Sequence, residues 1–347
     1  MNPEIVVRQA TAPEINAWDD LVGSFDNARV FHTKAWISSI EAFSGEKALY
    51  LVWQKGTAVV GCLPGFLVRI GFLRVFGSPL EGWQTDSMGP AFRRESISTN
   101  ELIASLVCFL EKTYRVHQIE LSSPSLDAEA MKRLGFRGQC LFTYRIPLFP
   151  GDKDRVMRSI NPKTRTQLRK AIKLGLVVKL HANESFIDES YSQIREVFTR
   201  KGKALPYSKK RLSQCVRYAE AGGKLLPISI LLPDESTSIA TGIFLIDGKE
   251  LYFWQWAHRT EYRWYCPSEL LMWTAMQKAM EAGCVTFDMS GGGRAKIKFG
   301  AVPDDTNYRW IRSRYEWLAA LRDLARAGYR WQQRARGRLY NFKSRAF

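Results

Sequence analysis

Residues 283–303, GCVTFDMSGGGRAKIKFGAVP, decide how the rest of the chain is interpreted. Gly283 is suited to end a helix, because a residue without a Cβ takes the left-handed C-cap conformation at little cost. The apolar run at 284–287 then predicts a short buried strand. Three glycines and a cationic segment follow. Glycines let a ligand approach backbone N–H groups, so the segment predicts either an anion- or oxyanion-binding loop or a plain glycine turn between strands.

The composition is that of a globular protein. The chain has 347 residues, of which 46% are hydrophobic and 12% aromatic, and this length is sufficient for two hydrophobic cores. The N-terminal sequence has acids and prolines where a signal peptide would have an apolar run, and no apolar run reaches the roughly 18 residues of a membrane span. Six scattered cysteines show no metal-ligand spacing, so we expect a cytoplasmic protein with reduced thiols and no metal.

The net charge of +17 is concentrated in two segments. Residues 155–183 hold eight Lys/Arg and no acid, and residues 309–347 hold eleven against two acids, which together account for the whole excess. Charge concentrated in this way indicates an anionic partner, namely RNA, a phospholipid surface or a phosphate-bearing substrate. The alternative is a solvated surface that keeps the protein soluble.

The order of predicted elements occurs twice. Each half has helical segments, then a β-hairpin, then a helix and a short strand, and Glu101 to Ser122 and Glu269 to Ser290 both span 21 residues. The repeat predicts an α+β (mixed α/β) fold of two modules, each a mixed sheet covered by helices. We place the modules at residues 1–150 and 151–310. Residues 311–347 are expected to form a basic tail with a helix at about 313–335.

Motifs of several enzyme classes are absent from the sequence. It contains no Gly-x-Ser-x-Gly elbow, no His-Glu-x-x-His, no Cys-x-x-Cys and no Walker loop. Alternation along a strand at 250–258 predicts that Trp254 and Trp256 share one face, and beside the cationic, glycine-rich loop they would suit a sugar or nucleotide group. Core packing accounts for these rings equally well. His258 follows this aromatic run, and a hydrogen-bonded histidine at a strand end is the alternative for it.

A set of motifs in the second half resembles the FemAB-like acyltransferases, a branch of the GNAT superfamily that includes the group named for CelD and BcsL. The matching pieces are KTRTQLRKA at 163–171, Tyr265-Cys266-Pro267 before a helix, the strand end Phe287-Asp288, and Lys296-x-x-Phe299-Gly300-Ala301. This sequence has Ala295 where the family has an aromatic residue. The resemblance covers most of residues 1–310 and implies two tandem GNAT-like modules.

The resemblance implies transfer of an acyl or aminoacyl group, from acyl-CoA or aminoacyl-tRNA, to an amine on a cell-envelope glycan or peptidoglycan-type precursor. It implies no tightly bound cofactor. The expected partners are the anionic donor or acceptor (CoA, tRNA or a phosphate-bearing glycan precursor), with peripheral contact to an anionic membrane. Typical GNAT enzymes hold the CoA pyrophosphate with an Arg/Gln-x-x-Gly-x-Gly/Ala loop, and this sequence has no such loop between a strand and a helix.

The expected site follows from these motifs. Lys296 would stabilise the oxyanion of the reacting carbonyl, and Tyr265 is the second candidate catalytic residue. The candidate binding residues are Arg294, Trp254, Trp256, His258, Asp288, Arg165 and Arg169. The rival hypothesis is a non-catalytic protein that binds RNA or a membrane surface on a transferase-like scaffold.

Overall fold

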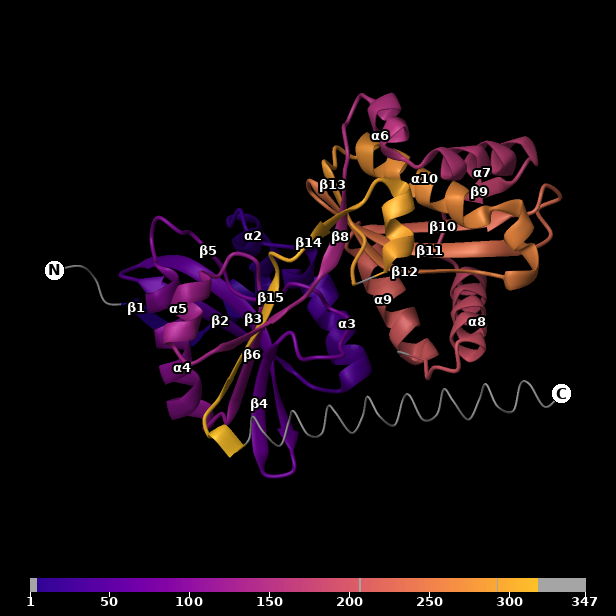
Figure 1. Cartoon of the computed structure of the whole chain (residues 1–347). Coiled ribbons are helices and arrows are strands. Elements are labelled where there is room, and N and C mark those ends of the chain that lie inside the picture. The colour runs from indigo at the N-terminus through magenta and orange to yellow at the C-terminus, as the bar shows by residue number, and fades with distance from the viewer. Residues whose placement is uncertain (1–4, 206, 292, 318–347) are drawn as a thin grey trace. The chain divides into compact units, whose positions relative to one another are not determined.

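The structure is a computed structural model that describes residues 5–205, 207–291 and 293–317. The chain forms two compact units (Figure 1). One consists of the residues up to Leu141 and a segment that begins at Asp305, and the other contains Phe142–Asp304. The helix predicted at 313–335 falls almost entirely on residues 318–347, outside the described residues. In the ranges described, no helix is long and apolar enough to cross a bilayer.

The sheet of the first unit has the strand order β1-β2-β3-β4-β6-β15-β7, and β5 pairs with β3. Its neighbouring strands are antiparallel except β4 and β6, which are parallel. The strands are β1 (Ile5–Gln9), β2 (Ala48–Lys55), β3 (Ala58–Ile70), β4 (Leu73–Ser78), β5 (Ala91–Phe92), β6 (Gln118–Ser122), β7 (Arg137–Cys140) and β15 (Tyr308–Ser313), and the helices are α1 (Ala12–Asn16), α2 (Trp18–Gly23), η1 (Val30–His32), α3 (Lys34–Ser44), α4 (Thr99–Tyr114) and α5 (Ala128–Arg133).

The sheet of the second unit has the order β14-β8-β13-β12-β11-β10-β9, with β12 and β13 parallel. Helices α7 and α10 cover one face of this sheet, and α8 and α9 cover the other (Figure 1). The strands are β8 (Thr143–Pro147), β9 (Val177–Lys179), β10 (Leu225–Leu231), β11 (Ser238–Asp247), β12 (Glu250–His258), β13 (Thr286–Asp288) and β14 (Val302–Asp304), and the helices are α6 (Lys153–Ser159), α7 (Pro162–Lys173), α8 (Glu184–Arg200), α9 (Lys209–Ala221), η2 (Thr260–Tyr265), α10 (Pro267–Glu281) and η3 (Arg294–Phe299).

The two sheets have the same topology, strand for strand, when β1 is matched to β9. In each sheet, the strand next to last comes from the other half of the sequence. β15 lies between β6 and β7, and β8 lies between β13 and β14. The predicted mixed α/β fold of two repeated modules is confirmed. The module boundaries differ from those expected, because β8, which precedes residue 150, pairs with β13, and β15, which begins before residue 310, pairs with β6.

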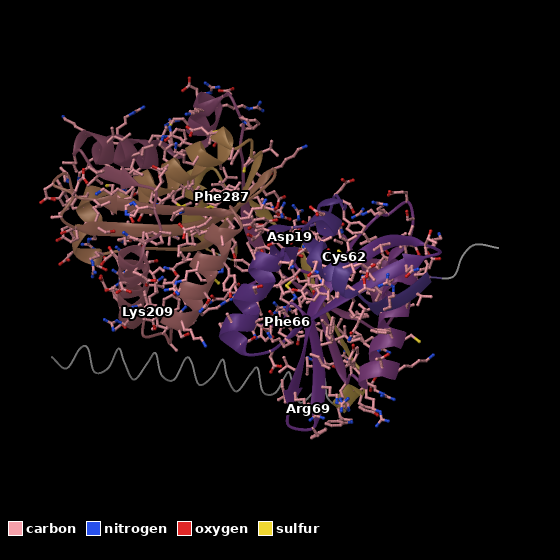
Figure 2. All side chains as sticks on the ribbon, turned by 180° about the vertical axis from the view of Figure 1, so that it is seen from behind. Asp19, Cys62, Phe66, Arg69, Lys209 and Phe287 are labelled. Carbon is pink, nitrogen blue, oxygen red and sulfur yellow. The ribbon has the colours of Figure 1, made fainter. Side chains whose placement is uncertain are left out.

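Each unit has a separate apolar core. Phe66 is fully buried in the first unit and Phe287 in the second (Figure 2). The structure contains the capping hydrogen bonds that the sequence predicts at two helix starts. Ser98 and Glu101 form the capping box that opens α4, and the Asn161 side chain accepts the N–H of Lys163 ahead of Pro162 at the start of α7.

Candidate active site

The parallel strands β12 and β13 separate at the point where the glycine-rich loop begins. They pair from Glu250 and Thr286 to Tyr252 and Asp288, where β13 ends. β12 continues to His258 alongside β11. Groups just beyond the carboxyl ends of parallel strands commonly bind ligands, because neighbouring chains diverge there. The loop that the sequence singles out therefore leaves the sheet where a ligand site is expected.

Lys296 lies at this opening, on η3. Its ammonium donates hydrogen bonds to the backbone carbonyls of Met289, at 2.7 Å, Gly291, at 2.9 Å, and Ser290, and it lies 5.7 Å from the centre of the Phe253 ring. Burial lowers the pKa of Lys296 to about 8, and the charge of Asp288 opposes that shift. The ammonium is therefore positioned by the loop that it closes.

Gly300 fixes the end of η3 and so the position of Lys296. Its φ of +82° is in the left-handed region that favours glycine. A Cβ added there would lie 2.5 Å from Oγ of Ser159, and the backbone N–H of Asn161 bonds to the carbonyl of Lys298 at 2.9 Å. Gly300 of the motif therefore allows η3 to pack against the start of α7.

Asp288 is buried and holds the first residues of the loop. Its Oδ1 accepts hydrogen bonds from Oγ1 of Thr143, at 2.7 Å, and from the N–H of Ser290, at 2.8 Å. Ser290 has a φ of +51°, which is unfavourable for a residue with a side chain, and the bond to Asp288 stabilises it. Asp288 was expected to bind substrate. The structure gives it protein partners and 2% exposure, and these contacts position the loop, while its role in substrate binding remains a prediction.

Arg145 joins four strands through three carboxylates. Its guanidinium lies 2.6 Å from Asp304, 3.4 Å from Asp288 and 3.5 Å from Glu250, on β14, β13 and β12. Because Arg145 is on the exchanged strand β8, these ion pairs fasten that strand to the end of the parallel pair. Sequence reasoning did not single out Arg145.

A second polar group lies at the start of α10. Nδ1 of His258 is 3.0 Å from Oγ of Ser268, and Nζ of Lys298 donates to Oε1 of Glu269 at 2.7 Å. Burial lowers the pKa of His258, the charge of Arg200 adds to that shift, and Glu269 opposes it. His258 is therefore neutral at pH 7. Glu269 and Lys298 tie α10 to the element that carries Lys296.

Tyr265 ends η2, just before Cys266 and the first turn of α10. Its ring lies 6.1 Å from that of Tyr262 and 5.4 Å from that of Trp264, and it packs against the core of the unit. Within the described residues, no contact joins its hydroxyl to Lys296. Its catalytic role remains a prediction.

The expectation that Trp254 and Trp256 share one face is wrong. The pairing of β12 with β11 shifts by one residue between Ile243 and Phe244, so β12 has a bulge at Trp254. A bulge inverts the alternation of side chains beyond it. Trp254 stacks on Tyr207 at 5.2 Å on the side of α8 and α9, whereas Trp256 lies on the other face, 5.8 Å from the His258 ring.

The basic helix α7 packs against α10 through buried Thr164, Leu168 and Ala171. Arg165 donates to the carbonyls of Met157 and Arg158 at the end of α6, and Arg169 is exposed. In the part of the chain that is described, neither side chain contacts the Lys296 loop. Arg294 begins η3 next to that loop. The binding roles of these arginines remain predictions.

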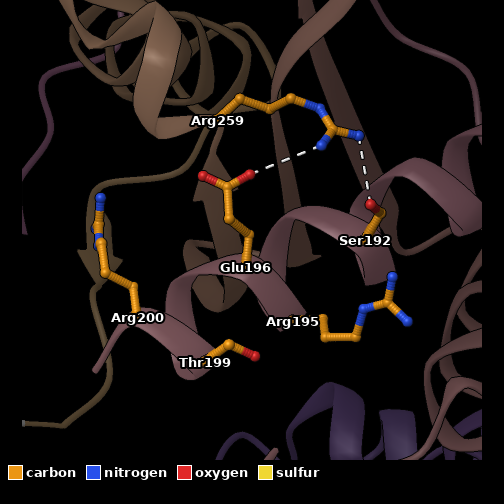
Figure 3. Close-up of a pocket in the computed structure, with 6 residues that line it drawn as sticks. All are labelled: Ser192, Arg195, Glu196, Thr199, Arg200 and Arg259. Atoms are coloured by element: carbon orange, nitrogen blue, oxygen red, sulfur yellow. Dashed lines mark hydrogen bonds and ion pairs between the residues drawn. The ribbon is translucent and has the colours of Figure 1, made fainter. Parts of the chain in front are cut away.

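A pocket of about 430 Å³ lies on α8 beside the end of β12 (Figure 3). Its lining includes three arginines and one acid, and the residues are Ser192, Arg195, Glu196, Thr199, Arg200 and Arg259. Arg259 is braced by Glu189, with both N–O distances at 2.9 Å, and donates to Ser192 at 3.3 Å. Arg195 and Arg200 are exposed, so the pocket presents positive charge next to His258.

Sequence reasoning missed this pocket. The available signal was the spacing of Ser192, Glu196 and Arg200, which puts these residues on one face of a helix. Arg259 joins these residues in the pocket because β12 lies against α8. Local sequence patterns do not predict this contact. Among the described residues, no group of three His, Cys, Asp or Glu side chains is placed to hold a metal ion.

Comparison with known proteins gives a family match to the part of the chain that contains this site. A family model described as an acetyltransferase (GNAT) domain matches residues 159–301, which include the separated parallel strands, the Lys296 loop and the pocket. Comparison with curated protein sequences gave no match.

The solved structures that resemble most of this chain include the following three. FemX matches with a TM-score of 0.69 at 14% identity, over 87% of this chain and 96% of its own. The structure of L-PGS from Bacillus licheniformis matches with a TM-score of 0.52 at 12% identity, over 89% and 93%. A tandem GNAT protein from the clavulanic acid biosynthesis pathway matches with a TM-score of 0.51 at 11% identity, over 89% and 98%.

The structural similarity shows the fold, and the family match shows that residues 159–301 resemble an acetyltransferase domain. This match to a GNAT domain and the fold that the chain shares with FemX agree with the resemblance of its motifs. The rival hypothesis of a non-catalytic scaffold is not supported, since the acetyltransferase domain covers the segment that holds the candidate site.

Proposed function

We propose that this enzyme transfers an acyl or aminoacyl group to an amine on a cell-envelope glycan or peptidoglycan-type precursor, and that Lys296 stabilises the reacting oxyanion. The observation that carries the proposal is the position of the Lys296 ammonium where β12 and β13 separate, half-buried and beside Asp288. A cation in a partly desolvated site stabilises developing negative charge more strongly than it would in water.

The reaction needs few groups. The neutral amine attacks the carbonyl carbon of the donor ester or thioester, and the carbonyl oxygen becomes an oxyanion. Collapse of this tetrahedral intermediate breaks the bond to the leaving oxygen or sulfur, and the nitrogen loses a proton. His258 is neutral at pH 7 and lies near the end of β12, so we assign it as the proton acceptor.

The Lys296 ammonium already donates to three carbonyls, so the oxyanion must replace one of them. Gly291 provides the exchangeable partner, because it is exposed and has no side chain to hold it in place. Met289 is buried next to β13 and retains its bond. In this arrangement the reacting oxygen displaces the Gly291 carbonyl from the ammonium.

The start of α10 favours aminoacyl-tRNA over acyl-CoA as donor. A helix N-terminus binds phosphate through free N–H groups and the helix dipole. Here Pro267 removes one N–H, and the Glu269 carboxylate lies in the first turn, buried and paired with Lys298. A pyrophosphate at this helix end would be repelled by that carboxylate. The localised positive charge of the chain fits tRNA.

The arginine pocket is suited to the phosphate of the acceptor. Arg195 and Arg200 present guanidinium groups that can bind phosphate oxygens in pairs, and Arg259 is fixed in place by Glu189. The volume of about 430 Å³ is large enough for a sugar phosphate. Because the pocket adjoins His258, a phosphate held there would direct the rest of the acceptor toward the end of β12.

Replacement of Arg195 and Arg200 by Gln is expected to raise KM for the acceptor at least about tenfold, because each lost charge-assisted hydrogen bond is worth about 1.5–3 kcal/mol. The turnover number should change little. Steady-state kinetics at fixed donor concentration measure both constants. Arg217→Gln is the control, since Arg217 is exposed on α9 and pairs with Glu184 at the opposite end of α8. An unchanged KM in the double variant would show that the pocket does not bind the acceptor.

The turnover number is expected to fall as pH rises through about 8. Only the protonated Lys296 stabilises an oxyanion, and its pKa is about 8, so the charged form is lost above that pH. Lys296→Arg keeps the charge at every accessible pH and should remove this fall, even if its overall rate is lower. A turnover number that rises through pH 8 in the unaltered enzyme and not in Lys296→Arg would instead make Lys296 a general base.

The function is tested by label transfer. The purified enzyme is incubated with an amine-bearing envelope precursor and either aminoacyl-tRNA or acyl-CoA, labelled in the acyl group. Labelled amide should form with aminoacyl-tRNA, and about 10²–10³ times more slowly with Lys296→Ala. Transfer from acyl-CoA alone would overturn the choice of donor, and transfer from neither would overturn the acceptor class.

A further inference from the structure

The turn between β3 and β4 ends in exposed apolar side chains. Ile70 and Phe72 flank Gly71 at the turn, and Phe72 is 73% exposed. The rings of Phe72 and Trp317 lie 6.4 Å apart, and Tyr315 stacks on Trp317 at 6.2 Å. We call these four residues, Ile70, Phe72, Tyr315 and Trp317, the hairpin-tip patch. They expose large apolar groups that pack against no core.

Cations surround the hairpin-tip patch. Arg69 and Arg74 face each other across the hairpin, and the guanidinium of Arg314 lies 5.7 Å from the Tyr315 ring. Figure 2 shows Arg69 near the end of the hairpin. The end of α4 lies here too, because Arg74 donates to the carbonyl of Tyr114 at 2.8 Å, and this brings the exposed side chains of Lys112 and Arg115 to the same end of the unit.

Few acids offset this charge. Glu111 is already ion-paired with Arg312, which leaves Glu316 as the acid within the segment of Tyr315 and Trp317. The patch is therefore apolar at its centre and cationic around it.

We propose that the hairpin-tip patch docks the protein on an anionic phospholipid surface. Trp and Tyr favour the headgroup level of a bilayer, and Phe and Ile favour the acyl boundary below it. Arginines around such a group meet the negative surface potential of anionic lipids. A hairpin turn exposes its apolar residues at a convex end, which suits shallow insertion. This surface lies outside the candidate active site and does not depend on the reaction assigned above.

The proposal is tested by vesicle flotation of the full chain. The probes are vesicles of phosphatidylcholine alone and vesicles that also contain phosphatidylglycerol. The unaltered protein should float with the anionic vesicles. The double variant Phe72→Ser with Trp317→Ser should bind them at least about tenfold more weakly, because burial of one large apolar side chain already changes an affinity by about tenfold or more. Arg69→Gln with Arg314→Gln should reduce the difference between the two kinds of vesicle.

Val6→Ser is the matched control, since Val6 is exposed on the edge strand β1 of the same sheet. It should float like the unaltered protein, and circular dichroism checks that each variant is folded. Binding that is unchanged in the Phe72 and Trp317 variant would overturn the proposal. So would binding that only Arg165→Gln with Arg169→Gln weakens, which would assign the membrane contact to α7. A patch that forms dimers and binds no vesicles would also overturn it.

Discussion

Lys296→Ala is expected to lower the turnover number by about 10²–10³, because removal of one group that stabilises an oxyanion typically has an effect of this size. Its ammonium lies half-buried at the end of the parallel pair, where no other described lysine makes the same contacts with the loop carbonyls. The measurement is single-turnover transfer of the labelled acyl group at saturating donor. It isolates the chemical step from product release.

The same substitution should leave the protein folded. The carbonyls of Ser290 and Gly291 can bond to water when the ammonium is removed, but Met289 is buried and its carbonyl loses a partner. We therefore expect the free energy of unfolding to fall by about 1–3 kcal/mol. Ile297→Ala is the control, since Ile297 is the next residue of η3 and is exposed. It should retain near-normal turnover. Near-normal turnover in Lys296→Ala would remove Lys296 from the mechanism.

Arg145→Leu is expected to have the largest effect on stability, with a loss of about 3 kcal/mol at pH 7, because removing one partner of a largely buried ion pair leaves uncompensated charge. Three carboxylates, on Glu250, Asp288 and Asp304, would face one another without a cation. Denaturant unfolding measures the change. Lys153→Leu is the control, because its ion pair with Glu281 is about half exposed and should contribute about 0–1 kcal/mol.

The effect of Arg145→Leu should depend on pH in a defined direction. Without the guanidinium, the three ionised carboxylates repel one another in the folded protein. Protonation at low pH removes this repulsion, and ionisation restores it as pH rises. The difference in stability from the unaltered protein should therefore be smallest near pH 4 and grow toward pH 7. A loss of the same size at every pH would show that packing, and not charge, is the cause.

The sequence by itself determined the elements that depend on near neighbours. The capping box of Ser98 and Glu101, the start of α7 at Asn161 and Pro162, and the helix end before Gly283 all have short-range causes, and the structure contains them. The repeated order of elements also follows from local patterns, and so does the position of Lys296 after a strand end. The family motifs rest on these same local features.

Only the tertiary structure decided which strands pair and which charges meet. β8 and β15 each join the sheet of the other half, because strand partners are chosen by sheet edges that are distant in sequence. That exchange brings Arg145 to its three acids. The bulge at Trp254 separates two tryptophans that alternation puts on one face, because one extra residue in a strand inverts every side chain after it. The arginine pocket likewise exists only once β12 crosses α8 and brings Arg259 to Arg195 and Arg200.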